Sequence, residues 1–127
     1  MRTHDRTDVD VLVLDDEPSV ASSWADILEL AGFKVGVAGS VDEAQDLAAR
    51  RTVHSIILDH SLVVDEPSVW PLDMAHRPAV ILVSGLGRDW LQQTQAQCGH
   101  RLFAALTKPV PPDHLIDVVR AAVAQGD

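Results

Sequence analysis

Short apolar segments of strand length alternate with longer segments of helical period along this chain. The apolar segments are Val9–Leu14, Phe33–Ala38, Ser55–Leu58, Ala79–Val83 and Leu102–Leu106. They are apolar at nearly every position, which is typical of strands covered on both faces of a parallel sheet. The pattern therefore predicts an α/β fold, a doubly wound five-stranded parallel sheet.

Three helices are predicted between or after these strands. The first begins at Pro18, since proline is tolerated in the first turn, and ends at Gly32. Its apolar stripe, which assigns the tryptophan to the core, is Val20, Trp24, Ile27, Leu28 and Ala31. The second follows Ser40, which forms a capping-box signature with Glu43. The last helix spans about Pro112–Ala124.

The segment between the third and fourth strands is irregular. It contains Pro67, Pro71 and Pro78, and a long helix cannot hold Pro71 in its interior. We expect a shortened third helix near Pro71–His76, or a loop with a single turn.

The composition is that of one soluble globular domain, with 46% hydrophobic and 23% charged residues. We expect residues 1–8 to form a flexible polar tail and residues 9–127 to form the domain. The net charge of −9, with ten basic residues, argues against direct nucleic acid binding. No apolar segment is long enough to span a membrane and no signal-peptide pattern is present, while the lone Cys98 suits a reducing compartment. These features predict a cytoplasmic chain that does not bind membranes.

Polar side chains capable of chemistry follow four of the predicted strands. They are Asp15 and Asp16 after the first strand, Asp59 after the third, Ser84 after the fourth and Lys108 after the fifth. Each alone is more simply explained as a cap, turn or surface residue. Ligands of open parallel sheets bind beyond the carboxyl ends of the strands, however, so the group as a whole indicates a site.

The chemistry of these groups points to phosphoryl transfer. Three crowded carboxylates repel one another unless a cation joins them, and their hard oxygens suit Mg²⁺. A carboxylate beside that metal is able to attack phosphorus and form an acyl phosphate. A lysine and a hydroxyl, here Lys108 and Ser84, would stabilise the charge on the transferred group.

The motifs that carry these residues resemble those of response regulator receiver domains of two-component signalling. They are Leu12–Pro18, Ile56–Asp59, Val83–Gly85 and Thr107–Pro109, and the resemblance runs from Val9 to Gln125. It implies a flavodoxin-like sheet of order 2-1-3-4-5. It also implies phosphoryl transfer to Asp59 from a histidine kinase or phosphotransfer protein, in a domain that is not otherwise an enzyme.

The resemblance also implies a metal site and a cis peptide bond. Asp16, Asp59 and the backbone carbonyl of Ser61 would ligate Mg²⁺, with Asp15 acting mainly through water. The bond between Lys108 and Pro109 is expected to be cis, as it is in that family.

The residues that report phosphorylation depart from the family pattern. In that family the switch consists of a hydroxyl residue, here Ser84, and an aromatic residue three positions before the lysine. Ala105 occupies the aromatic position in this chain. Phe103 is two residues earlier, on the same strand face if side chains alternate regularly. We therefore leave open whether Phe103 replaces the switch or belongs to the core.

Two further positions set the lifetime of the phosphoryl group in that family. Ser61 lies two residues after Asp59, and Leu86 lies two residues after Ser84. Because the apolar Leu86 offers no group to orient an attacking water, we expect a long-lived phosphoryl state.

Two other functions fit a sheet of this kind less well. A non-phosphorylated pseudo-receiver that binds proteins shares the fold, but usually lacks one of the acidic pair, the central aspartate or the lysine. An aspartate-nucleophile phosphatase has Asp-x-Asp-x-Thr after its strand, whereas this chain has Asp15–Ser19.

Several partner questions stay open. The downstream element is either a separate protein or a fused output domain, and the cognate kinase is not indicated. The chain is a stand-alone regulator, a relay intermediate or one domain of a longer protein, and a homodimer is left open.

Overall fold

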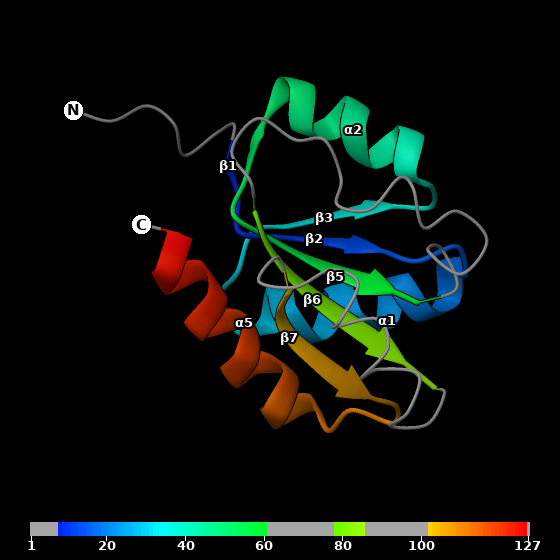
Figure 1. Ribbon diagram of the computed structural model, residues 1–127, viewed down its shortest axis with the longest axis vertical. Helices are drawn as coiled ribbons and strands as arrows, with labels where there is room; N and C mark the ends of the chain where they lie inside the picture. Colours follow the sequence, from blue (N-terminus) through cyan, green and yellow to red (C-terminus); the bar gives the residue numbers. More distant parts are fainter. Residues whose placement is uncertain (1–7, 61–77, 86–101, 127) are drawn as a thin grey trace.

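Five parallel strands form the central sheet of the computed structural model, which describes residues 8–60, 78–85 and 102–126 (Figure 1). The strands in sheet order are β3 (Val35–Ala38), β2 (Val11–Leu14), β5 (Ser55–Asp59), β6 (Ala79–Ser84) and β7 (Leu102–Thr107). Every neighbouring pair is parallel. Numbered among these five strands alone, the order is 2-1-3-4-5, which confirms the predicted fold class and topology.

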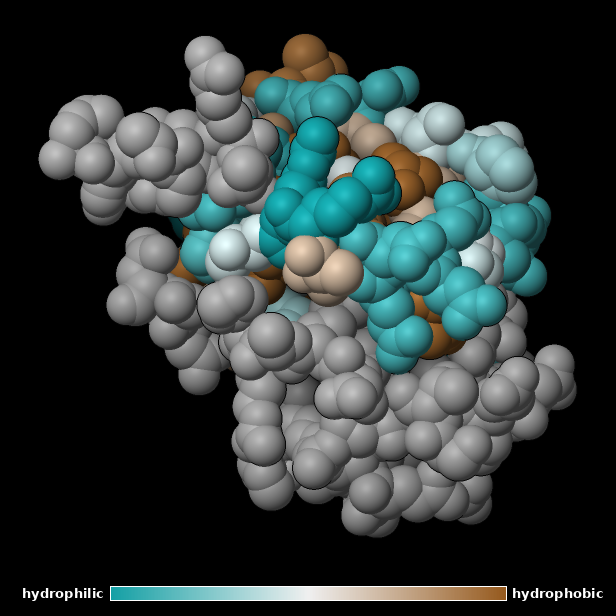
Figure 2. Space-filling model, turned by 90° about the horizontal axis from the view of Figure 1, so that it is seen from above, coloured by the Kyte–Doolittle hydropathy of each residue, from teal (hydrophilic) through white to brown (hydrophobic). Residues whose placement is uncertain are grey.

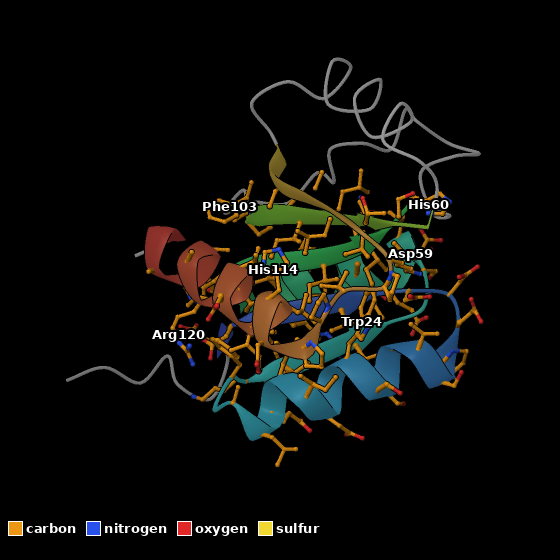
Figure 3. The ribbon with its side chains drawn as sticks, turned by 90° about the horizontal axis from the view of Figure 1, so that it is seen from below. Trp24, Asp59, His60, Phe103, His114 and Arg120 are labelled. Carbon is orange, nitrogen blue, oxygen red and sulfur yellow. The ribbon has the colours of Figure 1, made fainter. Side chains whose placement is uncertain are left out.

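Helices cover both faces of this sheet. They are α1 (Pro18–Leu30), α2 (Val41–Arg50) and α5 (Pro112–Gly126). Figure 3 shows α1 and α5 on the same side of the sheet, and α2 packs on the opposite face. The helix expected near Pro71–His76 lies outside the described residues.

The two faces bury separate apolar clusters, and β2 shows why its sequence is apolar throughout. Val11 and Val13 point into the cluster under α1 and α5, while Leu12 and Leu14 point into the cluster under α2. All four side chains are fully buried. Alternating side chains of a strand covered on both faces have no solvent-facing position, so none of them is polar.

The buried face of α1 differs from the predicted stripe. Its buried residues are Ala21, Ala25 and Leu28, and Trp24 lies half-buried at the edge of that face. Small alanine side chains let the helix approach the sheet closely, so the face is centred on them instead of on the largest apolar residues. The helix ends as expected before Gly32, whose φ of +101° lies in the left-handed region that favours glycine.

Helix α2 begins with the expected cap in a modified form. The Ser40 hydroxyl accepts a hydrogen bond from the Glu43 amide at 3.2 Å. The Glu43 carboxylate in turn accepts from the amide of Gly39 at 3.1 Å, one residue before the cap. Viewed from above, Figure 2 shows mainly hydrophilic residues among those described on this side of the molecule.

A second, two-stranded sheet extends the fold at the end away from the strands' carboxyl termini. It pairs β1 (Asp8–Val9) with β4 (Thr52–Val53) in parallel. Nearby, the Ser55 hydroxyl donates to the backbone carbonyl of Asp10 at 2.7 Å. Asp8, expected in the flexible tail, is therefore part of a strand. Among the described residues, no helix has the length and apolarity needed to cross a membrane.

Candidate functional site

Three carboxylates converge at the carboxyl edge of the sheet. Asp15 and Asp16 directly follow β2, and Asp59 ends the neighbouring strand β5, whose Leu58 is in register with Leu14. One oxygen from each of the three carboxylates lies within 4.8 Å of the others. Asp15 and Asp59 are buried and Asp16 is exposed, so the cluster opens to solvent on one side. This is the acidic group that the sequence predicts.

Asp15 is buried with a hydrogen-bond partner at only one of its two carboxylate oxygens. Its Oδ1 accepts a hydrogen bond from the Glu17 amide at 2.9 Å, while Oδ2 is buried without a hydrogen-bond partner. Burial raises the pKa of Asp15, and repulsion from Asp59 and Asp16 adds to the rise, against the opposing effects of the Glu17 amide and Lys108. A buried acceptor without a partner costs free energy. A bound cation would supply the missing interaction.

Lys108 reaches the cluster from the end of β7. Its Nζ lies 2.6 Å from Oδ1 of Asp59, with the two side chains 31% and 6% exposed. Its amide donates to the carbonyl of Ser84 at 2.7 Å, which fixes the start of the side chain. The following Lys108–Pro109 bond is cis, as expected.

Ser84 lies at the same edge, at the end of β6. It is fully buried, and it is paired in register with Thr107, the residue before Lys108. On its other side, β6 pairs with β5 so that Asp59 is opposite Val83. The strands therefore place Ser84 beside the cluster. Ser61 and Leu86, the other predicted site residues, lie outside the described residues.

The expectation that Phe103 shares a strand face with Ala105 is wrong. A register shift between Val80 and Ile81 pairs these residues with Leu102 and Ala104, which leaves Phe103 as the extra residue of a bulge. Phe103 packs into the cluster under α1 and α5, whereas Ala105 packs into the cluster under α2.

Phe103 is also remote from the acidic cluster. Figure 3 shows Phe103 toward one end of the sheet and Asp59 toward the other. The ring thus packs against the core on the side of α1 and α5, away from the acidic cluster.

One residue beside the site, Trp24, is not predicted from the sequence to lie there. The ring of Trp24, on α1, has its centroid 5.5 Å from Nζ of Lys108. Helical periodicity assigned Trp24 to the core, and the ring does pack against the cluster under α1 and α5. No spacing in the sequence relates it to Lys108, because the two residues come from elements far apart in the chain.

The donor set fits a hard divalent cation. Carboxylate oxygens from Asp15, Asp16 and Asp59 are close enough to share one ion, and such ligands suit Mg²⁺ or Ca²⁺. The unpartnered Oδ2 of Asp15 and the exposed position of Asp16 are consistent with an ion that keeps part of its water shell. Lys108 brings a positive charge to the same cluster, and Ser84 ends the adjacent strand at the same edge.

Comparisons with known proteins rest on structure alone. No protein-family model matches the chain, and no curated protein is significantly similar to it in sequence. A receiver domain protein (CheY-like) from Methanospirillum hungatei JF-1 is similar in structure, with a TM-score of 0.69 and 19% identity. That match covers 91% of this chain and 94% of the other.

Two further solved structures broaden the comparison. A Burkholderia pseudomallei response regulator with a phosphorylated aspartic acid and a calcium ion matches at a TM-score of 0.72 and 23% identity. That match covers 91% of this chain and 68% of the other. A structure described as an adenylate cyclase from Rhodopirellula baltica matches at 0.73 and 18% identity, over 95% and 90% of the two chains.

At sequence identities this low, a structural match shows a shared fold alone, because one fold hosts more than one function. The resemblance first seen in the strand-end motifs is confirmed at that level: this chain has the fold of the CheY-like receiver domains of response regulators.

Proposed function

We propose that this chain is a phosphoacceptor receiver domain, formed by residues 9–127, that takes a phosphoryl group onto Asp59. The observation that carries the proposal is the 2.6 Å contact between Lys108 and Asp59 inside a cluster of three carboxylates. A structural ion pair would not require Asp15 and Asp16 beside it. A site that handles a phosphoryl group requires both the fixed cation and the metal-binding acids.

Asp16 and Asp59 would hold Mg²⁺ together with the carbonyl of Ser61, and Asp15 would contribute mainly through water. Bound there, the ion would neutralise charge on the phosphoryl oxygens. The related fold in the Burkholderia pseudomallei regulator, solved with a phosphorylated aspartic acid and a calcium ion, supports this pairing of acyl phosphate and divalent cation.

The transfer step needs few protein groups. A carboxylate oxygen of Asp59 attacks the phosphorus of a phosphohistidine, and the P–N bond to the imidazole breaks. The histidine leaves neutral once its nitrogen takes up a proton. Lys108, already beside the attacking carboxylate, exchanges that contact for a phosphoryl oxygen. The Ser84 hydroxyl donates to another phosphoryl oxygen.

The proposal extends to the setting of the domain. The phosphoryl donor is a histidine kinase or phosphotransfer protein, and the phosphorylated domain acts on a downstream protein partner or a fused output domain. Autophosphorylation and self-dephosphorylation are its only chemistry. Ser61 and Leu86 occupy the two positions that set the lifetime of the phosphoryl group, and the apolar Leu86 favours a long-lived one. We place the chain in the cytoplasm. It does not contact nucleic acid directly, because its net charge of −9 disfavours binding to phosphates.

Beryllofluoride and acetyl phosphate, each with Mg²⁺, test the proposal. Native mass spectrometry should show an Mg²⁺-dependent adduct on the wild type that Asp59→Asn abolishes. Asp26→Asn, which changes an exposed carboxylate on α1, serves as the matched control and should keep the adduct. A wild type that forms no adduct would point to a pseudo-receiver, and sustained hydrolysis of an organic phosphate would point to a phosphatase.

A further inference from the structure

The ammonium of Lys108 is contacted by two groups of opposite chemical character. One is the Asp59 carboxylate, at 2.6 Å from Nζ. The other is the ring of Trp24, whose centroid is 5.5 Å from the same atom. That distance lies within the roughly 6 Å over which a cation is attracted to an aromatic face, and indole is the strongest such ring. The two contacts come from different elements, β5 and α1.

Trp24 and Lys108 are anchored to the molecule in different ways. Its ring packs against the apolar cluster under α1 and α5, next to the buried residues Ala21, Ala25 and Leu28 of the same helix. The backbone amide of Lys108 is fixed by a hydrogen bond to the carbonyl of Ser84. Its side chain is 31% exposed and carries the ammonium on a flexible four-carbon stem. The ring thus lies beside an ammonium that is carried on a long side chain and reaches Asp59. Figure 3 shows Trp24 and Asp59 toward the same end of the molecule.

We propose that Trp24 is a positioning residue for phosphoryl transfer, which keeps Lys108 over the phosphoacceptor while its carboxylate contact is exchanged for a phosphoryl oxygen. This inference rests on the proposed function. The indole face suits the task because it attracts the ammonium without a formal negative charge that would cancel the charge of the lysine. An acidic side chain at the same place would compete with the phosphoryl group for the lysine.

The contact should also make Trp24 a reporter of the site. Indole emission responds to a nearby charge, and the charge here moves when Asp59 is modified. The chain has three tryptophans, so replacing Trp70 and Trp90 with phenylalanine leaves Trp24 as the only one.

A pair of variants separates the effect of the aromatic face of Trp24 from the effect of its apolar volume. Trp24→Phe keeps an aromatic face and Trp24→Leu keeps only apolar volume, so both lose packing but only the second loses the attraction. We expect Trp24→Leu to slow phosphorylation by acetyl phosphate about two- to fivefold, with Trp24→Phe closer to the wild type. Equal rates for both variants and the wild type would overturn the inference. Should Trp24→Leu not fold, Trp24→Met takes its place.

A double-mutant cycle shows whether Trp24 acts through Lys108. Affinity for beryllofluoride with Mg²⁺ should fall about two- to fivefold on Trp24→Leu in the wild type, and should not change when Lys108→Met is already present. An equal loss in both backgrounds would mean that the ring acts on folding alone, and would refute the positioning role.

The fluorescence of the single-tryptophan protein supplies the independent readout. Its emission should change when beryllofluoride and Mg²⁺ are added, and the change should vanish with Asp59→Asn and with Lys108→Met. A change that survives Lys108→Met would contradict the inference. The two proposals fail differently: if the wild type forms no adduct, the proposed function falls, whereas an adduct insensitive to the Trp24 variants removes only the positioning role.

Discussion

The ammonium of Lys108 lies 2.6 Å from Oδ1 of Asp59, and this contact joins the ends of two strands, β7 and β5, that are separated by β6 in the sheet. It brings a positive charge to a cluster of three carboxylates that otherwise repel one another. In the proposed function this contact has two opposed effects. Lys108 would compete with a metal ion for Asp59, and it would provide the charge that a phosphoryl oxygen needs.

Replacing this lysine should therefore separate metal binding from chemistry. In Lys108→Met, Mg²⁺ affinity is expected to rise about three- to tenfold, because a partly exposed charge that repels the metal is gone. Phosphorylation by acetyl phosphate is expected to slow on the order of 100-fold, the usual cost of losing one donor to the developing charge. Calorimetric Mg²⁺ titration and intact-mass kinetics measure the two effects.

The control for this experiment is Lys34→Met. Lys34 is an exposed lysine before β3, at the end of the sheet away from the cluster, so its removal should alter neither quantity. Weaker Mg²⁺ binding in Lys108→Met, or an unchanged rate, would show that Lys108 plays a structural part only.

Asp15 should limit the stability of the metal-free protein. Its carboxylate is buried beside Asp59 and Asp16, and its Oδ2 has no hydrogen-bond partner. Asp15→Asn keeps the oxygen that accepts from the Glu17 amide. It also replaces the negative charge that repels Asp59 and Asp16 with the N–H donors of an amide. Like charges about 5 Å apart repel by roughly 3 kcal/mol near a surface, part of which Lys108 already offsets, so a gain of about 1–2 kcal/mol is expected.

Urea denaturation without divalent ions measures this gain, and a saturating Mg²⁺ concentration should reverse it, since the wild type alone keeps the full set of ligands. Asp46→Asn, an exposed carboxylate on α2, is the control and should change stability little. A less stable Asp15→Asn in the absence of metal would contradict the assignment of strain to Asp15.

The pH dependence of that difference follows from the direction of the pKa shift. Burial, with repulsion from Asp59 and Asp16, raises the pKa of Asp15 above its usual 3.8, so the charged form is disfavoured in the folded state. The destabilisation is complete at neutral pH, diminishes as pH falls through the raised pKa, and is absent below about 3.8. The stability advantage of Asp15→Asn should shrink over the same interval in urea titrations, and an advantage that grows toward acid pH would refute it.

The site was predictable from the sequence because strand ends fix it. Apolar segments end sharply at Asp15, Asp59 and Ser84, and parallel strands bring their carboxyl ends to one edge. Whichever helices cover the sheet, those side chains must meet. Lys108 follows from the same rule, since it comes directly after β7.

Features that depend on how elements pack were not predictable in this way. The buried face of α1 is centred on Ala21 and Ala25, because close approach favours small residues over the larger ones that periodicity emphasises. The contact between Trp24 and Lys108 depends on where α1 lies against β7, which no local pattern encodes. The bulge at Phe103 has no glycine or polar residue to mark it, so regular alternation placed the ring on the wrong face.

The bulge makes a specific prediction about how phosphorylation is reported. Phe103 packs under α1 and α5, away from Asp59, so Phe103→Leu should lower stability by about 1 kcal/mol through lost apolar burial and leave beryllofluoride affinity unchanged. Phe33→Leu is the control for the binding measurement, because Phe33 is also half-buried against the same cluster, although it has Arg120 at 5.7 Å from its ring centroid. Urea midpoints should fall in both variants, and their beryllofluoride titrations should agree with the wild type. A loss of beryllofluoride affinity in Phe103→Leu that Phe33→Leu does not share would show that the Phe103 ring is coupled to the phosphoacceptor through the sheet. Phe103 would then serve as the aromatic switch residue that is absent at position 105.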